Sequence, residues 1–293
     1  MPPEIYTGTA GWSYKDWIPN FYPKAQSAKF DWLRFYAQYF NCVEVNASYY
    51  AYMAPKVVEG WISKVEEVKE FLFTYKLHQD FTHKKDYNSQ KIKAVTYNLD
   101  LLAESERLGG LLIQFPYSFG FTNANTEYLG RLCEAFENYP KFIEVRHSSW
   151  NNKSATEFGR AGNITFCTID QPVVGQAVKF EPVITNDKAY IRFHGRNEEA
   201  WKQSVKSFGK HQTYEEQNSR YKYFYSPGEL NEIDLKIKEV FDKVKKVFVV
   251  MNNHPTGYAV ANAFELMKML KNGREIELPE TILKAFPRLK RIA

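Results

Sequence analysis

The 293-residue chain has little cysteine and no long hydrophobic run. Its three cysteines, Cys42, Cys133 and Cys167, are far apart, odd in number and set among apolar residues, which indicates neither a disulfide framework nor a zinc knuckle. No apolar stretch approaches the ~18 residues that a membrane-spanning helix needs, and no signal-peptide segment follows the N-terminus. We therefore expect a cytoplasmic protein with free thiols and no membrane span.

The sequence also lacks a strong excess of one charge, and it lacks the glycine motifs that bind nucleotides. Lysine and arginine number 39 against 34 aspartates and glutamates, so the formal net charge is only +5. This excess falls short of a polybasic composition, yet it is compatible with an anionic ligand. The sequence has no dinucleotide fingerprint and no P-loop, and Gly8, Gly11 and Gly195 offer only close backbone approach to a ligand. We expect no cofactor.

The chain does contain eight short runs of β-branched and aromatic residues, each followed by polar or charged side chains. Most are separated by one-sided helical stretches, such as the one that carries Leu230, Ile233 and Ile237 at helical spacing. Apolar strands that alternate with helices are typical of a parallel sheet buried on both faces, and eight of them predict a single (β/α)8 TIM-barrel domain over residues 1–293. The runs are Ile5–Thr7, Val43–Asn46, Phe71–Lys76, Leu111–Gln114, Phe142–Arg146, Ile164–Asp170, Ala189–His194 and Val247–Asn252.

Two connections break this alternation. Residues 171–188 contain Pro172, Gly175 and Pro182 and show no helical period, which predicts an irregular sixth connection. Residues 195–227 form a long insertion after the seventh strand, in which aromatic side chains alternate with cations. Such interleaving suits base stacking and phosphate contact, but glutamates dilute its charge, so we favour a surface loop anchored by its aromatics.

In a TIM barrel, the C-terminal ends of the strands and the loops that follow them build the active site. The polar side chains at these ends should therefore converge on one mouth. We expect Glu44, Glu144, Asp170 and His194 to be catalytic. We expect the substrate to be bound by Trp12, Tyr14, Asn46, Lys76, Gln114, Arg146, Arg192, Arg196, Asn252, Asn253 and His254.

These residue types suit an anionic substrate, such as one that carries a phosphate. Guanidinium forks bind phosphate bidentately, and we expect Arg192 and Arg196 to hold a phosphate or sulfate at the mouth. Carboxylates in different surroundings have separated pKa values and serve as general acid and base. Structural ion pairing is the alternative for Arg146 and for Glu44, and the sequence leaves it open. We interpret the chain as a hydrolase or a lyase.

The histidines near the strand ends raise the question of a metal. They lack the close spacing of a zinc motif and stand beside arginines, which oppose a dication, so we predict a metal-independent site. Two other functions stay open. One is a nucleic-acid-binding or repair-associated protein, including a metal-dependent nuclease, and the other is a barrel that binds a small molecule without catalysis. The histidines in question are His78, His147, His194 and His254.

Short polar and aromatic motifs mark nearly every strand end. The first loop reads GTAGWSYKDW over residues 8–17, and later motifs read QFP at 114–116, EVRH at 144–147, RFHGR at 192–196 and NNHP at 252–255. Together they resemble the YecE-like family (domain of unknown function 72), a family of TIM barrels. Ala10 stands where a serine is frequent in that family, and Met251 stands where an aromatic residue is common. The resemblance implies a barrel with its marked residues at the strand ends, but no settled reaction.

Overall fold

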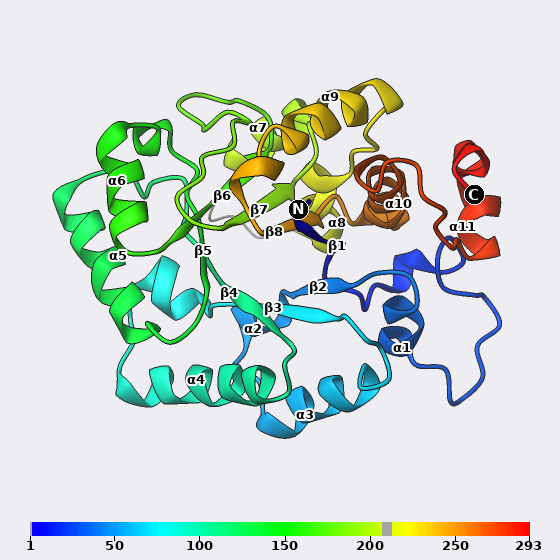
Figure 1. The fold of residues 1–293 in the computed structure, drawn as a ribbon, viewed down its shortest axis with the longest axis horizontal. Helices are drawn as coiled ribbons and strands as arrows, with labels where there is room; N and C mark the ends of the chain where they lie inside the picture. The colour runs from blue at the N-terminus through cyan, green and yellow to red at the C-terminus, as the bar shows by residue number, and fades with distance from the viewer. Residues whose placement is uncertain (1, 207–212) are drawn as a thin grey trace.

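The computed structural model describes residues 2–206 and 213–293 and shows eight parallel strands in a closed barrel (Figure 1). The strands follow each other around the ring in chain order, and the eighth pairs with the first to close it. The predicted (β/α)8 barrel is therefore confirmed. The strands are β1 (Glu4–Ala10), β2 (Cys42–Val45), β3 (Leu72–Lys76), β4 (Leu108–Gln114), β5 (Lys141–Glu144), β6 (Thr165–Asp170), β7 (Lys188–Phe193) and β8 (Lys246–Met251).

Helices surround the barrel, and local sequence sets where they begin. Ser226, which precedes Pro227, forms a capping box with Glu229, and the expected stripe of Leu230 and Ile233 is buried. No helix in the described part of the chain has both the length and the apolar composition needed to cross a bilayer. The helices are α1 (Trp32–Ala37), α2 (Ala47–Tyr50), α3 (Pro55–Lys64), α4 (Ser89–Glu104), α5 (Asn123–Ala135), α6 (Lys153–Ala161), α7 (Glu198–Lys206), α8 (Tyr214–Asn218), α9 (Pro227–Lys238), α10 (Tyr258–Leu270) and α11 (Glu280–Ala285).

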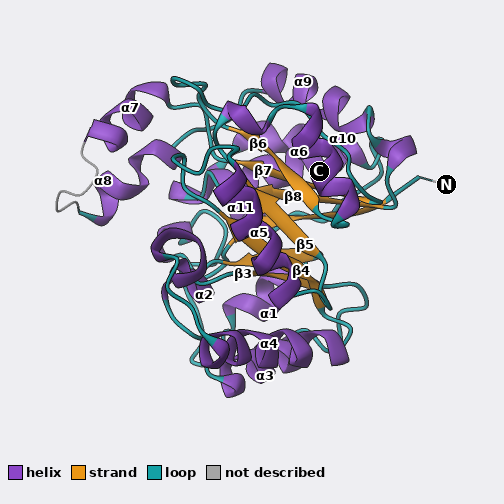
Figure 2. Ribbon diagram, turned by 90° about the vertical axis from the view of Figure 1, so that its left-hand side faces the viewer, coloured by secondary structure: helices purple, strands orange, loops and turns teal. Residues whose placement is uncertain are grey.

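The two unusual connections have different outcomes. No helix forms between β6 and β7, as predicted for this proline-containing segment. The insertion after β7 contains α7 and α8 where a loop was expected, and its Trp201 is buried, as expected of an aromatic anchor. A capping box between Thr213 and Glu216 starts α8, and glutamates in the first turn of α7 suit the positive end of its helix dipole. Figure 2 shows both helices at one end of the barrel, with the N-terminus at the other.

The interior of the barrel has an aromatic floor below a charged layer. Tyr6 stacks on Phe248 at 4.9 Å between ring centroids, and Phe142 stacks on Tyr190 at 4.4 Å. These rings fill the lumen toward the N-terminal ends of the strands. Side chains alternate between the two faces of a strand, so residues two or four positions farther along the same strands stand above this floor and face the mouth.

A close approach between β1 and β2 requires a glycine at position 8. A Cβ atom there would lie 1.9 Å from the carbonyl oxygen of Cys42 and 2.8 Å from the hydroxyl oxygen of Tyr36. That hydroxyl donates to the Cys42 carbonyl and accepts from the backbone N–H of Thr9, so it is fixed in place. The strands cannot keep this register with a larger residue.

We expect Gly8→Ala to lower the free energy of unfolding by about 3 kcal/mol, because the methyl group forces the two strands apart. Gly60→Ala in α3 is the matched control, since nothing lies within 4 Å of its Cβ position and alanine favours a helix. Urea unfolding followed by circular dichroism measures both. An equal effect of the two substitutions would show that the strand approach is not constraining.

Candidate functional site

The charged layer of the lumen is centred on Arg192, which lies between two buried carboxylates. Its Nε is 2.9 Å from Oε2 of Glu44 and its Nη2 is 2.6 Å from Oε1 of the same residue, while its Nη1 donates to Oε2 of Glu144. All three side chains are fully buried. Because they come from β7, β2 and β5, this shared ion pair connects strands on different sides of the ring.

Neighbouring groups complete the pairing of these carboxylates. The hydroxyl of Tyr190 donates to Oε2 of Glu44 at 2.8 Å and is itself 2.8 Å from the hydroxyl of Thr74. Burial alone would raise the pKa of Glu144, but Arg192 and Arg146 hold it well below its usual range. Glu144 is therefore ionised at neutral pH, and its oxygens are engaged by guanidinium groups.

Arg146 lies above Glu144, and only part of its guanidinium is hydrogen-bonded to that carboxylate. Its Nε and Nη2 contact Oε1 of Glu144 at 2.8 and 2.7 Å. In the described part of the chain, its Nη1 has no hydrogen-bond partner, and its guanidinium faces the ring of Trp201 at 5.7 Å. One edge of this guanidinium is thus available to an anion at the mouth.

Lys76 is a buried cation without an ionic partner. It ends β3 with 8% of its surface exposed, and its Nζ lies 4.5 Å from the centre of the Tyr49 ring. No carboxylate of the described residues lies at ion-pair distance from it. Burial and the charge of Arg192 lower the pKa of Lys76 to about 7, although Glu44 and Glu144 oppose the shift. A large share of this amine is therefore neutral near neutral pH.

His194 is fully buried and neutral. Burial lowers its pKa to about 3. Its Nδ1 lies 2.9 Å from the amide nitrogen of Asn252, which can only donate, so Nδ1 accepts and Nε2 carries the proton. Oε2 of Glu144 is 3.5 Å from Nε2, which is too long for a strong hydrogen bond. Buried polar atoms that lack a hydrogen-bond partner in the described chain include His194 Nε2, Asn46 Oδ1 and His254 Nδ1.

The insertion after β7 covers His194. The rings of Trp201 and Tyr221 lie 6.4 and 6.2 Å from its imidazole, and the guanidinium of Arg220 lies over both rings at 5.4 and 4.7 Å. None of these three residues is among those expected from the sequence to form the site. The alternation of aromatics and cations in the insertion was the available signal, and interpreting it as a surface loop missed them.

Asp170 and Arg196 do not join Arg192 and the carboxylates. Asp170 accepts from Arg196 Nε at 3.0 and 3.1 Å and from Nη2 at 2.7 Å, and the hydroxyl of Tyr225 donates to it at 2.6 Å. Asp170 is in register with Phe193, whose side chain belongs to the outer core, so it faces away from the lumen. The expectation that Asp170 converges with Glu44 in the lumen is wrong for this reason, and its catalytic role stays a prediction.

The contacts of Arg192 and Arg196 also bear on the expectation that they hold a phosphate or sulfate. The guanidinium of Arg192 is buried and pairs with Glu44 and Glu144, and that of Arg196 pairs with Asp170 and with Glu229, whose Oε1 lies 3.2 Å from its Nη1. Both guanidinium groups are therefore already paired with carboxylates, and phosphate binding by them stays a prediction. Arg146 and Lys76 are two other cations near the mouth.

The structure places other expected residues as follows. Tyr14 stacks on His254 at 4.5 Å, and His254 Nε2 lies 3.1 Å from Asn218 Oδ1. Trp12 packs edge-on against Trp61 of α3 at 5.6 Å. Gln114 is half-buried and in register with Glu144. Asn253 donates to Tyr223 and Asn262, so its amide is held by the protein.

We call the converging set the mouth cluster; its members are Glu44, Lys76, Glu144, Arg146, Arg192 and His194. Within residues 2–206 and 213–293, no three histidine, cysteine, aspartate or glutamate side chains gather so that they could hold a metal ion. Metal independence was inferred from the surrounding positive charge, and it stays a prediction.

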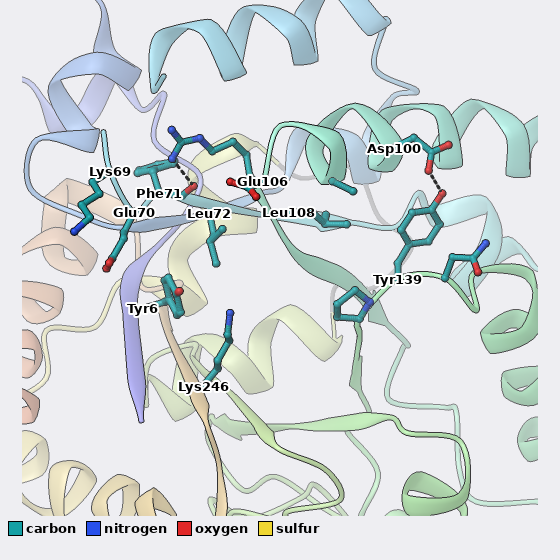
Figure 3. A pocket seen from close by; sticks show the side chains of 14 residues that line it. Tyr6, Lys69, Glu70, Phe71, Leu72, Asp100, Glu106, Leu108, Tyr139 and Lys246 are labelled. Carbon is teal, nitrogen blue, oxygen red and sulfur yellow. Dashed lines mark hydrogen bonds between the residues drawn. The ribbon is translucent and has the colours of Figure 1, made fainter. Parts of the chain in front are cut away.

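A cavity of about 530 Å³ opens elsewhere, beside the first residues of β3, β4 and β8 (Figure 3). It is lined by both charge signs, including Lys69, Glu70 and Lys246, and a hydrogen bond joins Tyr139 to Asp100 at its edge. Active sites of TIM barrels lie at the opposite, C-terminal end. We therefore place the candidate site at the mouth cluster.

The chain is similar in sequence to a family of proteins of unknown function and to two curated proteins. A family model described as "Protein of unknown function DUF72" matches residues 6–285. The UPF0759 protein YunF of Bacillus subtilis is 29% identical over 278 residues, which cover 91% of this chain and 94% of that protein. The UPF0759 protein YecE of Escherichia coli (strain K12) is 28% identical over 155 residues, 52% of each chain.

Two solved structures of DUF72 family proteins are similar to this chain in fold and in sequence. A crystal structure of a DUF72 family protein from Thermotoga maritima has a TM-score of 0.78 and 31% identity, and the match covers 92% of this chain and 99% of that one. A DUF72 family protein from Enterococcus faecalis has a TM-score of 0.76 and 26% identity, covering 91% of this chain and 95% of that one.

Replacing Lys76 by methionine should stabilise the protein in a pH-dependent way. The pKa of Lys76 is about 7 in the folded protein against an ordinary value of 10.5, so between these values the unfolded chain binds a proton that the folded protein lacks. Wild-type stability therefore rises with pH relative to Lys76→Met. We expect the advantage of the variant to be largest at and below about pH 7 and to shrink above it by up to about 1.4 kcal/mol per pH unit.

Urea unfolding of both proteins at about pH 7 and about pH 9 measures this difference. Lys153→Met is the control, because the side chain of Lys153 is 90% exposed and its removal should have the same small effect at both pH values. A stability difference between wild type and Lys76→Met that does not change with pH would contradict the placement of Lys76.

Proposed function

The chain belongs to the DUF72 family of proteins of unknown function, and we propose that it is an enzyme, a hydrolase or a lyase, that acts on a small anionic substrate at the C-terminal mouth of its barrel. The single observation that carries the proposal is the arrangement of the mouth cluster. Arg192, Glu44 and Glu144 form a paired ionic layer. Directly above it lie polar groups that are incompletely paired within the described chain, on Lys76, Arg146 and His194.

The anionic group of the substrate is recognised by Arg146 and Lys76. Arg146 has an unused Nη1, and Lys76 has no ionic partner in the described chain. Both residues are buried, so a hydrogen bond from either to an anion forms in a region of low dielectric constant. Arg192 has a different role, because it holds Glu44 and Glu144 in place and lowers the pKa of Glu144.

The groups that carry the chemistry are His194 and Lys76. The neutral imidazole of His194 presents an unpaired Nε2–H, which suits stabilisation of negative charge that develops on a substrate oxygen. The pKa of Lys76, about 7, suits proton transfer at neutral pH. Glu144 is a poor base, because Arg192 and Arg146 hold its pKa low. We therefore assign Glu44 and Glu144 as positioning residues and no longer as general acid and base.

Two observations favour this proposal over the alternatives. The aromatic and cationic side chains of the insertion pack on one another, with Arg220 over Trp201 and Tyr221, which leaves these faces less suited to stacking on bases. A barrel that only binds a ligand has no need of a buried lysine whose pKa lies near 7, since desolvating an unpaired ammonium group is costly.

We expect calorimetry at low salt to detect binding of glycerol 1-phosphate and of sulfate at slightly acidic pH, where Lys76 is charged. Arg146→Gln should weaken this binding about tenfold to a hundredfold, because a charge-assisted hydrogen bond contributes about 1.5–3 kcal/mol. Arg160→Gln removes an equal charge from the exposed face of α6 and should leave binding unchanged.

Absence of binding, or an equal loss in both variants, would contradict anion recognition at the mouth. Tighter binding of a single-stranded oligonucleotide with a steep salt dependence would favour the nucleic-acid alternative instead. Elemental analysis of the same samples, purified without chelators, tests the metal prediction. Zinc, manganese or iron near one equivalent that disappears in His194→Ala would contradict it.

A further inference from the structure

We propose that Lys76 is a nucleophile that forms a Schiff base with the substrate, and that the substrate is therefore an aldehyde or ketone that also carries an anionic group. This inference rests on the proposed function and makes it more specific. It identifies the covalent step and the class of compound at the mouth.

The surroundings of Lys76 differ from those of the other buried lysine of the barrel. Lys141 is equally buried at the start of β5, but its Nζ donates to the backbone carbonyls of Phe136, Glu137 and Tyr139 at 3.0–3.3 Å. The Nζ of Lys76 has no acceptor in the described chain, and it faces the Tyr49 ring at 4.5 Å from the ring centre. Lys141 is held as a structural group, whereas the amine of Lys76 is free to react.

The electrostatics of the mouth keep this amine in its reactive form. A Schiff base forms only from a neutral amine, and an ordinary lysine is almost wholly protonated at neutral pH. Burial and the positive charge of Arg192 lower the pKa of Lys76 to about 7. Arg146 adds to this effect and also provides the contact for the anionic group of the substrate.

The step balances without any further reagent. The nitrogen lone pair of Lys76 attacks the carbonyl carbon, a carbon–nitrogen bond forms, and the carbonyl oxygen becomes a hydroxyl group by taking a proton from the amine. Loss of this hydroxyl together with the second amine proton releases water and leaves a carbon–nitrogen double bond. Hydrogen bonding from the Nε2–H of His194 stabilises the charge on the departing oxygen.

The test uses glycolaldehyde phosphate, a small aldehyde with a phosphate group, and cyanoborohydride, whose hydride reduces the imine to a stable secondary amine. The full chain is incubated with both reagents at a series of pH values, and peptide mass spectrometry measures the rate of labelling at each lysine. We expect Lys76 to be labelled at least about tenfold faster than the exposed Lys153 at neutral pH. Its rate should level off above about pH 7.

Two variants and one further reagent complete the design. Lys76→Arg keeps a cation in place but cannot form the imine, so the fast phase should vanish, and Lys153→Met should retain it. Glycolaldehyde without phosphate should label Lys76 more slowly, and Arg146→Gln should remove that difference.

Labelling of Lys76 that is no faster than that of Lys153, or that rises steadily with pH, would overturn the inference. If calorimetry still shows Arg146-dependent anion binding in that case, the proposed function stands and only the covalent step fails.

Discussion

Arg192 donates hydrogen bonds to Glu44 and Glu144 in the interior of a closed barrel, and the organisation of the mouth depends on this shared ion pair. Side chains inside a small barrel are shielded from water, so an unpaired charge there is strongly unfavourable. Two carboxylates on separate strands hold the guanidinium in one position, and the hydroxyl of Tyr190, from the aromatic floor, donates to one of them, Glu44. The ion pair thereby sets the level in the lumen above which the polar side chains of the mouth lie.

The groups above this layer acquire their properties from it. Glu144 is shared between two arginines, so it cannot fully neutralise Arg146, and neither carboxylate reaches ion-pair distance of Lys76. Positive charge and burial together lower the pKa of Lys76 to about 7 and that of His194 to about 3. A layer that is paired for stability therefore leaves an amine and an imidazole neutral enough for chemistry near neutral pH.

The sequence predicts which residues reach the mouth better than it predicts what they contact there. Arg192 and His194 are two positions apart at the end of an apolar run, so they must share a face, and the structure places both in the lumen. Asp170 ends a run in the same way, but the face it occupies depends on the register between β6 and β7, which no local pattern specifies. The partners of Arg192 lie 148 and 48 residues away along the chain, so only the closed barrel shows that carboxylates use its guanidinium. The position of Trp201 over His194 likewise results from the tertiary fold of the insertion.

A double-mutant cycle on Arg192 and Glu44 tests most directly whether this buried ion pair organises the barrel. The free energies of unfolding in urea are compared for wild type, Arg192→Met, Glu44→Gln and the double variant. If the account is correct, Arg192→Met costs about 3–5 kcal/mol, because it leaves two buried carboxylates without a counter-charge. Adding Glu44→Gln should then cost much less than it does in wild type, with a coupling energy of about 1–3 kcal/mol. Additive effects, or a cost of Arg192→Met below about 0.5 kcal/mol, would contradict it.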